Sequence, residues 1–318
     1  MCAQPRNLYF AWQLEVMLNN FIKNGISQSD IIVLVATKDN DIPMHITMWD
    51  MLTSHFKFVN FYFYEDTRNI DSKYVSAVRP HIIKKHFLKF TELEKETIFY
   101  HDCDIVFTKP VDFSSLCNDD IWYLSNTINY ISYNYIISKG KSVYDRMCEI
   151  VGIDKNIPKL MNNHSGGAQY IMKGLTYEYW DKVERDSEIL FSEITNMNIQ
   201  LKKDNPDYHS LQIWCADMWA VLWNAWLFGF RTELHKELDF IWPHQLIENW
   251  NNSNIFHNSG VMGKDSSHLF KKSNFTNTVP YKQYFENHYY SQFCSYNYYN
   301  EIIETSKITC FKPILNEL

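Results

Sequence analysis

Apolar stretches alternate with amphipathic ones along the first 110 residues. Continuous runs of β-branched and aromatic residues predict strands at 7–12, 31–36, 58–64 and 97–100. Apolar residues at helical spacing predict helices at 14–23 and 74–89. Strands that alternate with helices form mostly parallel sheets flanked by helices, and such sheets bind ligands at the carboxyl ends of their strands. We therefore expect an α/β, Rossmann-like fold.

The order of elements changes after Pro110. Apolar and aromatic runs predict an antiparallel pair of strands at 121–125 and 130–138. Helices are predicted at 143–151, over the charged stretch 177–193 and over the apolar stretch 214–223. No linker composition or internal repeat interrupts the chain. We expect one domain over 1–275, with a ligand-binding half at 1–110 and an elaborated half at 111–275, followed by an aromatic-rich extension at 276–318.

The composition favours an enzyme-sized globular protein. The chain has 318 residues, of which 46% are hydrophobic, so it can bury a sizeable core. Its net charge of −7 is modest and its basic residues are dispersed, which argues against a nucleic-acid partner. An anionic substrate would have to be met locally, by a metal ion or by a few placed cations. Most of the aromatic side chains are expected in the core.

Cysteine usage and hydropathy bear on the compartment. The seven cysteines form neither a C-x-x-C pair nor a disulfide framework, which indicates a reducing compartment. No secretory signal is visible near the N-terminus, and the longest apolar stretch, 218–230, is interrupted by Asn224 and too short to span a bilayer. We expect a cytoplasmic chain without a membrane segment. A Golgi or endoplasmic reticulum lumen is the alternative if an anchor was removed.

Two carboxylates leave the predicted strand at 97–100 together. His101, Asp102, Cys103 and Asp104 follow it directly, and side chains two residues apart on an extended segment point to one face. Asp102 and Asp104 can therefore converge on one hard cation through oxygen ligands. The alternative is a turn in which they cap backbone N–H groups. We expect Asp104 at the surface, where it contributes little to stability.

Two segments of the second half carry further candidate chemistry. Gly166 and Gly167 lie in the loop 163–169, where they either allow close approach of the backbone to a ligand or make a plain turn. Asp217 is a lone acid near the start of the apolar helix 214–223. It is either an N-cap or an acid that lines a sugar pocket, where it contacts hydroxyl groups or serves as a base.

A histidine follows later, at the end of a short apolar run. His257 comes after Ile255 and Phe256 and is followed by Gly260 and Lys264. The imidazole could complete a metal shell and Lys264 could neutralise a phosphate. A structural role for His257 is the alternative.

Together these motifs resemble metal-dependent glycosyltransferases of the GT-A fold, in which an Asp-x-Asp holds Mn²⁺ or Mg²⁺ on the diphosphate of a nucleotide sugar. His257-x-x-Gly260 is similar to the third metal ligand of glycogenin-like retaining transferases, with Lys264 one position from their spacing. Four blocks also resemble plant and algal peptidyl hydroxyproline arabinosyltransferases and serine galactosyltransferases, which often have Glu in place of Asp217: 9–13, 79–81, 101–106 and 214–219.

The resemblance implies that 1–110 is the nucleotide-binding half and 111–275 the sugar and acceptor half, and it implies a role for each candidate. Asp104 and His257 would bind the metal, and Asp102 would be shared between metal and ribose. Because one ligand is a histidine, Mn²⁺ is favoured over Mg²⁺. Arg79 and Lys264 would contact the diphosphate of a donor that we expect to be a UDP-sugar.

The remaining candidates would surround the base and the sugar. Tyr9, Phe10 or Trp12, expected at the end of the first strand, would flank the base. Gly166, Gly167, Gln169 and Asp217 would face the sugar, and Gly260 belongs to the metal motif. The acceptor would be a hydroxyl group of a glycan or protein. Retention of configuration is favoured, with Asp217 positioning the sugar; in an inverting enzyme Asp217 would be the base.

Two other classes of function remain open from the sequence. A Mg²⁺-dependent nucleotidyl- or phosphotransferase would share the paired acids and the sheet, but it usually adds a G-x-x-x-x-G-K loop, which this chain lacks. A non-catalytic carbohydrate-binding protein is suggested by the Tyr- and Asn-rich stretch 281–300.

Overall fold

The chain divides into two compact units, each assembled from separate stretches of sequence. The computed structural model describes residues 1–68, 74–260, 268–282 and 291–315. Unit 1 comprises Met1–Glu65, His101–Phe113 and Asp239–Leu318, and unit 2 comprises Asp66–Tyr100 and Ser114–Leu238. The chain therefore passes from unit 2 to unit 1 directly before the paired acids.

A parallel sheet begins unit 1. Strands β1 (Cys2–Pro5), β2 (Ile32–Thr37) and β3 (Asn60–Glu65) pair in the order β1-β2-β3. Helices α1 (Leu8–Lys23) and α2 (Pro43–His55) connect them, as parallel pairing requires. The central strand buries Val33, Leu34 and Val35, which explains its continuous apolar sequence.

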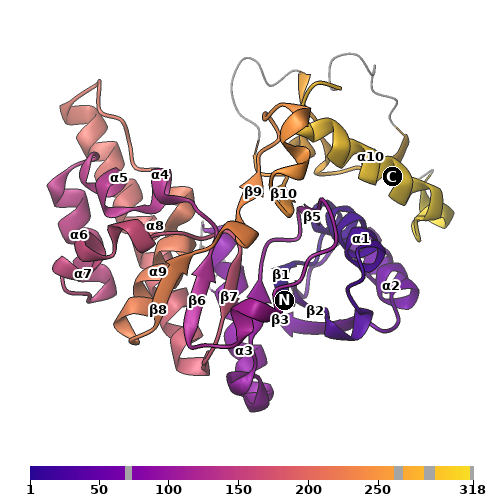
Figure 1. Ribbon diagram of the computed structural model, residues 1–318, viewed down its shortest axis with the longest axis horizontal. Coiled ribbons are helices and arrows are strands. Elements are labelled where there is room, and N and C mark those ends of the chain that lie inside the picture. Colours follow the sequence, from indigo (N-terminus) through magenta and orange to yellow (C-terminus); the bar gives the residue numbers. More distant parts are fainter. Residues whose placement is uncertain (69–73, 261–267, 283–290, 316–318) are drawn as a thin grey trace. The chain divides into compact units, whose positions relative to one another are not determined.

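A second small sheet of unit 1 consists of β5 (Ile105–Phe107), β10 (Ile255–His257) and β9 (Phe240–Ile241), in the order β5-β10-β9. Strand β10 runs antiparallel to β5 and parallel to β9. Every residue of β5 and β10 is buried. Helix α10 (Cys294–Ile308) packs against α1, and the two are the yellow and indigo helices of Figure 1.

Unit 2 contains a mixed sheet covered by long helices. Its strands are β4 (Ile98–Tyr100), β7 (Tyr170–Met172), β6 (Ile121–Leu124) and β8 (Arg231–Leu234), in the order β4-β7-β6-β8. Only the β6–β8 pair is parallel among these strands. The 28-residue helix α8 (Tyr177–Asp204) packs against three other helices, and one of these, α9 (Ala216–Leu227), lies beside β8 (Figure 1). The other two are α3 (Val78–Lys89) and α6 (Lys141–Val151).

The strand predicted at 7–12 is wrong, because this stretch is the N-cap and the first residues of α1. Asn7 is the N-cap, and its side chain accepts a hydrogen bond of 3.1 Å from the backbone N–H of Phe10. Leu8, Ala11 and Trp12 are buried at helical spacing. The first strand lies earlier, at Cys2–Pro5.

The strand predicted at 130–138 is also wrong. Two short helices occupy it, α4 (Ile128–Ile131) and α5 (Tyr133–Ile137), and a further short helix, α7 (Asn156–Leu160), follows α6. Ser132 caps α5 by accepting a hydrogen bond from the backbone N–H of Tyr135. The Tyr and Ile residues that suggested a strand favour β structure only where a neighbouring strand pairs with them.

The hydropathy of the helices gives one further result. Within the described parts of the chain, no helix combines the length and the apolar character needed to cross a bilayer.

Candidate functional site

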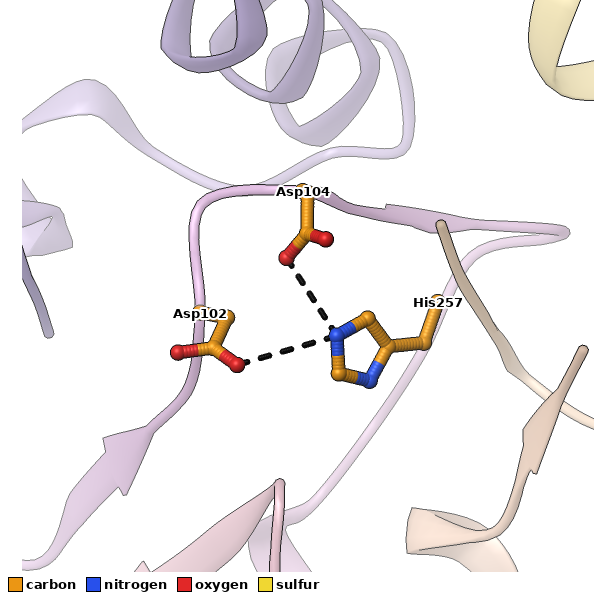
Figure 2. A group of neighbouring side chains, drawn as sticks. All are labelled: Asp102, Asp104 and His257. Atoms are coloured by element: carbon orange, nitrogen blue, oxygen red, sulfur yellow. Dashed lines mark ion pairs between the residues drawn. The ribbon is translucent and has the colours of Figure 1, made fainter. Parts of the chain in front are cut away.

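Asp102, Asp104 and His257 lie together in unit 1 (Figure 2). His257 Nε2 is 3.3 Å from Asp104 Oδ1 and 3.6 Å from Asp102 Oδ2. One ligand atom from each side chain can be chosen so that all lie within 4.8 Å of one another. The three residues predicted as metal ligands are thus neighbours in space, although 153 positions of sequence separate Asp104 from His257.

Strand pairing brings the histidine to the two acids. Strand β4 ends at Tyr100 and β5 begins at Ile105, so the acids occupy the short loop between them. His257 is the last residue of β10 and is paired with Ile105 in the antiparallel register. The backbone N–H of Asn258 then donates to Asp104 O at 2.9 Å. This register places the imidazole beside the acids.

Asp104 is buried, so the expectation of a surface acid is wrong. It is 5% exposed, and Lys272, at the start of a 3-10 helix (Lys272–Phe275), donates a hydrogen bond to its Oδ2. Burial alone would raise the pKa of Asp104, but the charges of Lys272 and His257 outweigh it and hold this pKa below its usual range. Burial likewise acts to lower the pKa of Lys272, and Asp104 raises it overall. Both groups are therefore charged at neutral pH.

The neighbouring His101 is a neutral structural residue. It is 3% exposed, its backbone N–H donates to Met1 O, and its Nδ1 donates to Asp102 O at 2.8 Å. Burial, followed by the charge of the N-terminus, lowers its pKa well below the usual value. His101 therefore anchors the loop that carries the two acids.

The donor set fits a divalent metal ion. Two ligands of one ion at about 2.0–2.3 Å each are separated by at most about 4.5 Å, and by about 3 Å at a right angle. The distances of 3.3 and 3.6 Å from His257 Nε2 agree with this geometry. Lys272 forms its ion pair with Asp104 Oδ2, and Asp104 Oδ1 is the oxygen that faces His257. Two carboxylates and one imidazole would leave further coordination positions for a substrate.

The other predicted residues of unit 1 differ in their environments. Trp12 does not end a strand: it lies inside α1 with no exposed surface, and its Nε1 donates to Phe275 O at 3.1 Å, which makes it a core residue. Tyr9 is half-buried; burial first, and then Asp104, raise the pKa of its hydroxyl. That hydroxyl is thus within electrostatic reach of the acids. Gly260 is exposed, whereas Lys264 lies outside the described residues.

Asp217 is held by two side chains within unit 2. Tyr74 Oη donates to its Oδ1 at 2.6 Å, and Arg79 Nη2 donates to its Oδ2 at 2.5 Å. Asp217 is not the N-cap of α9; Cys215 has that position, and Asp217 lies in the first turn. Burial and the charge of Asp217 raise the pKa of Tyr74 well above its usual value, so this hydroxyl keeps its proton. Arg79, predicted to contact a diphosphate, is paired with this acid.

The glycine loop of unit 2 is packed against its own protein. A Cβ on Gly166 would lie 2.3 Å from Ser125 O, and a Cβ on Gly167 would lie 2.4 Å from Tyr170 Oη. Ala168 follows with a φ of 76°, a left-handed conformation that residues with a Cβ rarely adopt. Gln169 is fully buried, and its Oε1 accepts a hydrogen bond of 2.7 Å from Ser125 Oγ. Close packing thus requires both glycines.

Sequence reasoning missed two side chains that donate hydrogen bonds to the predicted carboxylates. Lys272 lies in a segment with no recognisable motif, and Tyr74 stands in a stretch predicted to be the start of a helix. Helix α3 begins only at Val78, after a 3-10 turn (Val75–Ala77). No sequence spacing could have indicated these contacts, because Lys272 is 168 positions from Asp104 and Tyr74 is 143 positions from Asp217.

Comparison with known proteins identifies the fold. No protein-family model and no curated protein matches the chain. The chain is similar to the apo structure of WbbM, a bifunctional glycosyltransferase, with a TM-score of 0.50 and 9% sequence identity. This match covers 98% of the chain and 51% of the WbbM chain, so the protein spans about half of that length. A second match, with a TM-score of 0.41 and 10% identity, covers 95% of the chain and 94% of the galactosyltransferase LgtC, solved with donor and acceptor sugar analogs.

The likeness to WbbM shows the fold. It confirms the fold class predicted from the sequence, an α/β GT-A-type arrangement with a parallel sheet and flanking helices.

Proposed function

We propose that the protein is a metal-dependent glycosyltransferase that moves a sugar from a nucleotide sugar to a hydroxyl group of a glycan or protein. The observation that carries this proposal is the group Asp102, Asp104 and His257 in a chain of this fold. Two acids and an imidazole are suitable ligands for Mn²⁺ or Mg²⁺, and the histidine favours Mn²⁺. The likeness to WbbM, itself a glycosyltransferase, supports the reaction class.

The charges around the metal group suit a diphosphate. Asp102 and Asp104 carry two negative charges, and Lys272 offsets one of them. With a divalent ion the group would be positive by one charge, which favours an anionic ligand. The ion would supply electrostatic stabilisation of the charge that develops on the departing diphosphate. We assign Lys272 as a cation for this diphosphate in addition to Lys264, which was predicted for that role.

Asp217 would act on the sugar as a positioned carboxylate. Its two oxygens already accept hydrogen bonds from Tyr74 and Arg79. Both oxygens are thus engaged by fixed partners within unit 2. This arrangement suits contact with sugar hydroxyl groups in a retaining reaction better than the role of a base, which would have to accept a proton at one of these oxygens. UDP-sugars are the donors we propose.

Calorimetry tests the proposal. UDP should bind only when Mn²⁺ or Mg²⁺ is present, and His257→Ala should weaken this binding without abolishing it because two carboxylates remain. His244→Ala is the matched control, since His244 is an exposed histidine of the same unit. A screen of nucleotide sugars for slow hydrolysis then identifies the donor without an acceptor.

The two alternatives give different results in the same experiments. A carbohydrate-binding protein would bind sugar and ignore UDP with or without metal. A nucleotidyl- or phosphotransferase would cleave a phosphoanhydride bond and release no free sugar. Either result would contradict the proposed function.

A further inference from the structure

Tyr74 makes an unusual set of contacts with the first turn of α9. Its Oη lies 2.6 Å from Asp217 Oδ1, 2.9 Å from the backbone N of Asp217 and 2.9 Å from Trp214 O. The side chain is 4% exposed, and its ring is stacked on Phe191 with centroids 4.5 Å apart. The hydroxyl thus has three polar atoms within hydrogen-bond distance.

Counting protons assigns the direction of each bond. The backbone N–H of Asp217 can only donate, so Tyr74 Oη accepts there. The single phenolic proton must then go to Asp217 Oδ1 or to Trp214 O. The carboxylate is charged and lies at the shorter distance, so it takes the proton in a charge-assisted bond. The hydroxyl thus connects the side chain of Asp217 to the backbone of the same residue.

Asp217 is thereby constrained at both carboxylate oxygens. Tyr74 holds Oδ1 and Arg79 holds Oδ2, and bonds to both oxygens fix the two side-chain torsions. Asp217 is the second residue of α9, where the backbone N–H has no partner within the helix. Cys215, at the N-cap, makes no side-chain cap bond in the described structure, and Tyr74 supplies the acceptor from another element.

We propose that Tyr74 is a positioning residue that orients the Asp217 carboxylate toward the hydroxyl groups of the transferred sugar. This inference rests on the proposed function, in which Asp217 contacts the sugar. A carboxylate with one proton donor on each oxygen still has a free lone pair on each. These lone pairs point in fixed directions, so a sugar hydroxyl group can donate a hydrogen bond to the carboxylate without any change in its orientation.

Paired variants test the inference. Tyr74→Phe removes only the hydroxyl. Tyr179→Phe is the matched control, because Tyr179 is fully buried in the same unit and its hydroxyl donates to Val221 O on α9 at 2.7 Å. Both variants should lower the urea midpoint of unfolding. Tyr74→Phe should reduce kcat for donor hydrolysis at least tenfold while the Kd of UDP with Mn²⁺ stays within twofold. Tyr179→Phe should leave both parameters within twofold.

A double-variant cycle with Asp217→Asn separates positioning from a general structural effect. If Tyr74 acts through Asp217, adding Tyr74→Phe to Asp217→Asn should change kcat by less than twofold. The losses in urea midpoint should also be less than additive. A tenfold loss that persists in the Asp217→Asn background, or a Tyr74→Phe variant with wild-type kcat, would overturn the inference.

Failure of the proposed function gives a distinct result. In that case the wild-type protein hydrolyses no nucleotide sugar, and the result contradicts both the proposed function and the positioning role of Tyr74. When the inference alone fails, the wild-type protein is active and Tyr74→Phe matches it.

Discussion

The half-buried Lys272 forms an ion pair with the buried Asp104, in which it donates to one carboxylate oxygen and leaves the other facing His257. One acid is thus shared between a fixed cation and the proposed metal site. A buried carboxylate next to a second acid would be difficult to keep ionised without such a partner. The lysine therefore sets both the charge of the site and the stability of its surroundings.

Removing this lysine should change the affinities for metal and nucleotide in opposite directions. In Lys272→Met the metal-bound site carries one more negative charge, because the bound ion itself would keep Asp104 ionised, and Asp104 Oδ2 is released. Mn²⁺ should therefore bind more tightly, by about tenfold for each 1.4 kcal/mol gained. UDP should bind more weakly at saturating Mn²⁺, because the diphosphate loses a cation. Isothermal titration measures both affinities.

Lys109→Met is the control for Lys272→Met, since Lys109 is an exposed lysine of the same unit. It should change neither affinity. If Lys272→Met weakened Mn²⁺ and UDP binding equally, the lysine would serve the fold and not the charge of the site.

The two acids should differ in what they contribute to stability. Asp102 is half-buried, so Asp102→Asn should weaken Mn²⁺ binding about tenfold or more and leave unfolding within about 0.5 kcal/mol. Asp104→Asn should weaken Mn²⁺ binding as well, but it should also destabilise the protein by about 3–5 kcal/mol because Lys272 loses its charged partner. Asp39→Asn, at an exposed acid of the same unit, controls for lost charge. Equal stabilities of the two variants would argue against a stabilising ion pair between Asp104 and Lys272.

Asp217→Asn should keep measurable transfer. Asn preserves one oxygen acceptor and the shape of the side chain, so a carboxylate that positions the sugar is replaced only in part, whereas a base would be lost. The product made from an α-linked UDP-sugar should be an α-glycoside, as judged by the NMR coupling constant of the anomeric proton. A β-glycoside would reverse the stereochemical assignment and make Asp217 the leading candidate for the base.

Gly167→Ala should destabilise the protein by about 1–3 kcal/mol, because the new methyl group would overlap Tyr170 Oη and the Met218 side chain. Adding Tyr170→Phe removes the atom at 2.4 Å and should restore part of the loss. Gly260→Ala is the control, since a Cβ there meets no atom of the described residues within 4 Å, and its effect should stay within about 0.5 kcal/mol. Urea denaturation measures all three. A stable Gly167→Ala would mean that the loop moves freely.

Acidification should destabilise the protein partly through His86. This side chain is buried in α3, and burial, then Lys89, lower its pKa from 6.5 to about 4. Between these two values the unfolded chain binds more protons than the folded one. The contribution of the neutral His86 ring to the free energy of unfolding is therefore fully present above pH 6.5 and is lost as the pH falls toward 4. In His86→Gln the free energy of unfolding should depend less steeply on pH over this range.

His209→Gln, at an exposed histidine, serves as the control for His86→Gln. Unfolding free energies at pH 7.5, 6 and 5 provide the comparison. Identical slopes for His86→Gln and the wild-type protein would show that the ring binds a proton as readily in the folded state as in the unfolded one.

Several elements could be predicted from the sequence because their signals are local. The β-branched run at 31–36 forms the central strand β2, and the charged helical stretch at 177–193 forms the first part of α8. The stretch 7–12 was predicted wrongly because aromatic residues are common both in strands and on the buried face of a helix. Here the helix is favoured by Asn7, which caps its N-terminus by accepting a hydrogen bond from the backbone N–H of Phe10.

The candidate metal group was predictable for a related reason. Asp102 and Asp104 are neighbours in the chain, and a histidine at the end of a short apolar strand is a visible pattern. The pattern could not reveal that Asp104 is buried, because this depends on Lys272 and on the pairing of β5 with β10 next to it.

The sequence by itself determined the α/β character of the chain and the identity of its proposed metal ligands, because residue spacing encodes strands, helices and short motifs. Only the tertiary structure decided that Asp104 is paired with Lys272, that Asp217 is held by Tyr74 and Arg79, and that Trp12 belongs to the core. Each of these pairings joins residues more than 130 positions apart. Such contacts form when packing buries polar groups that must then find partners, and no local pattern specifies which partner they meet.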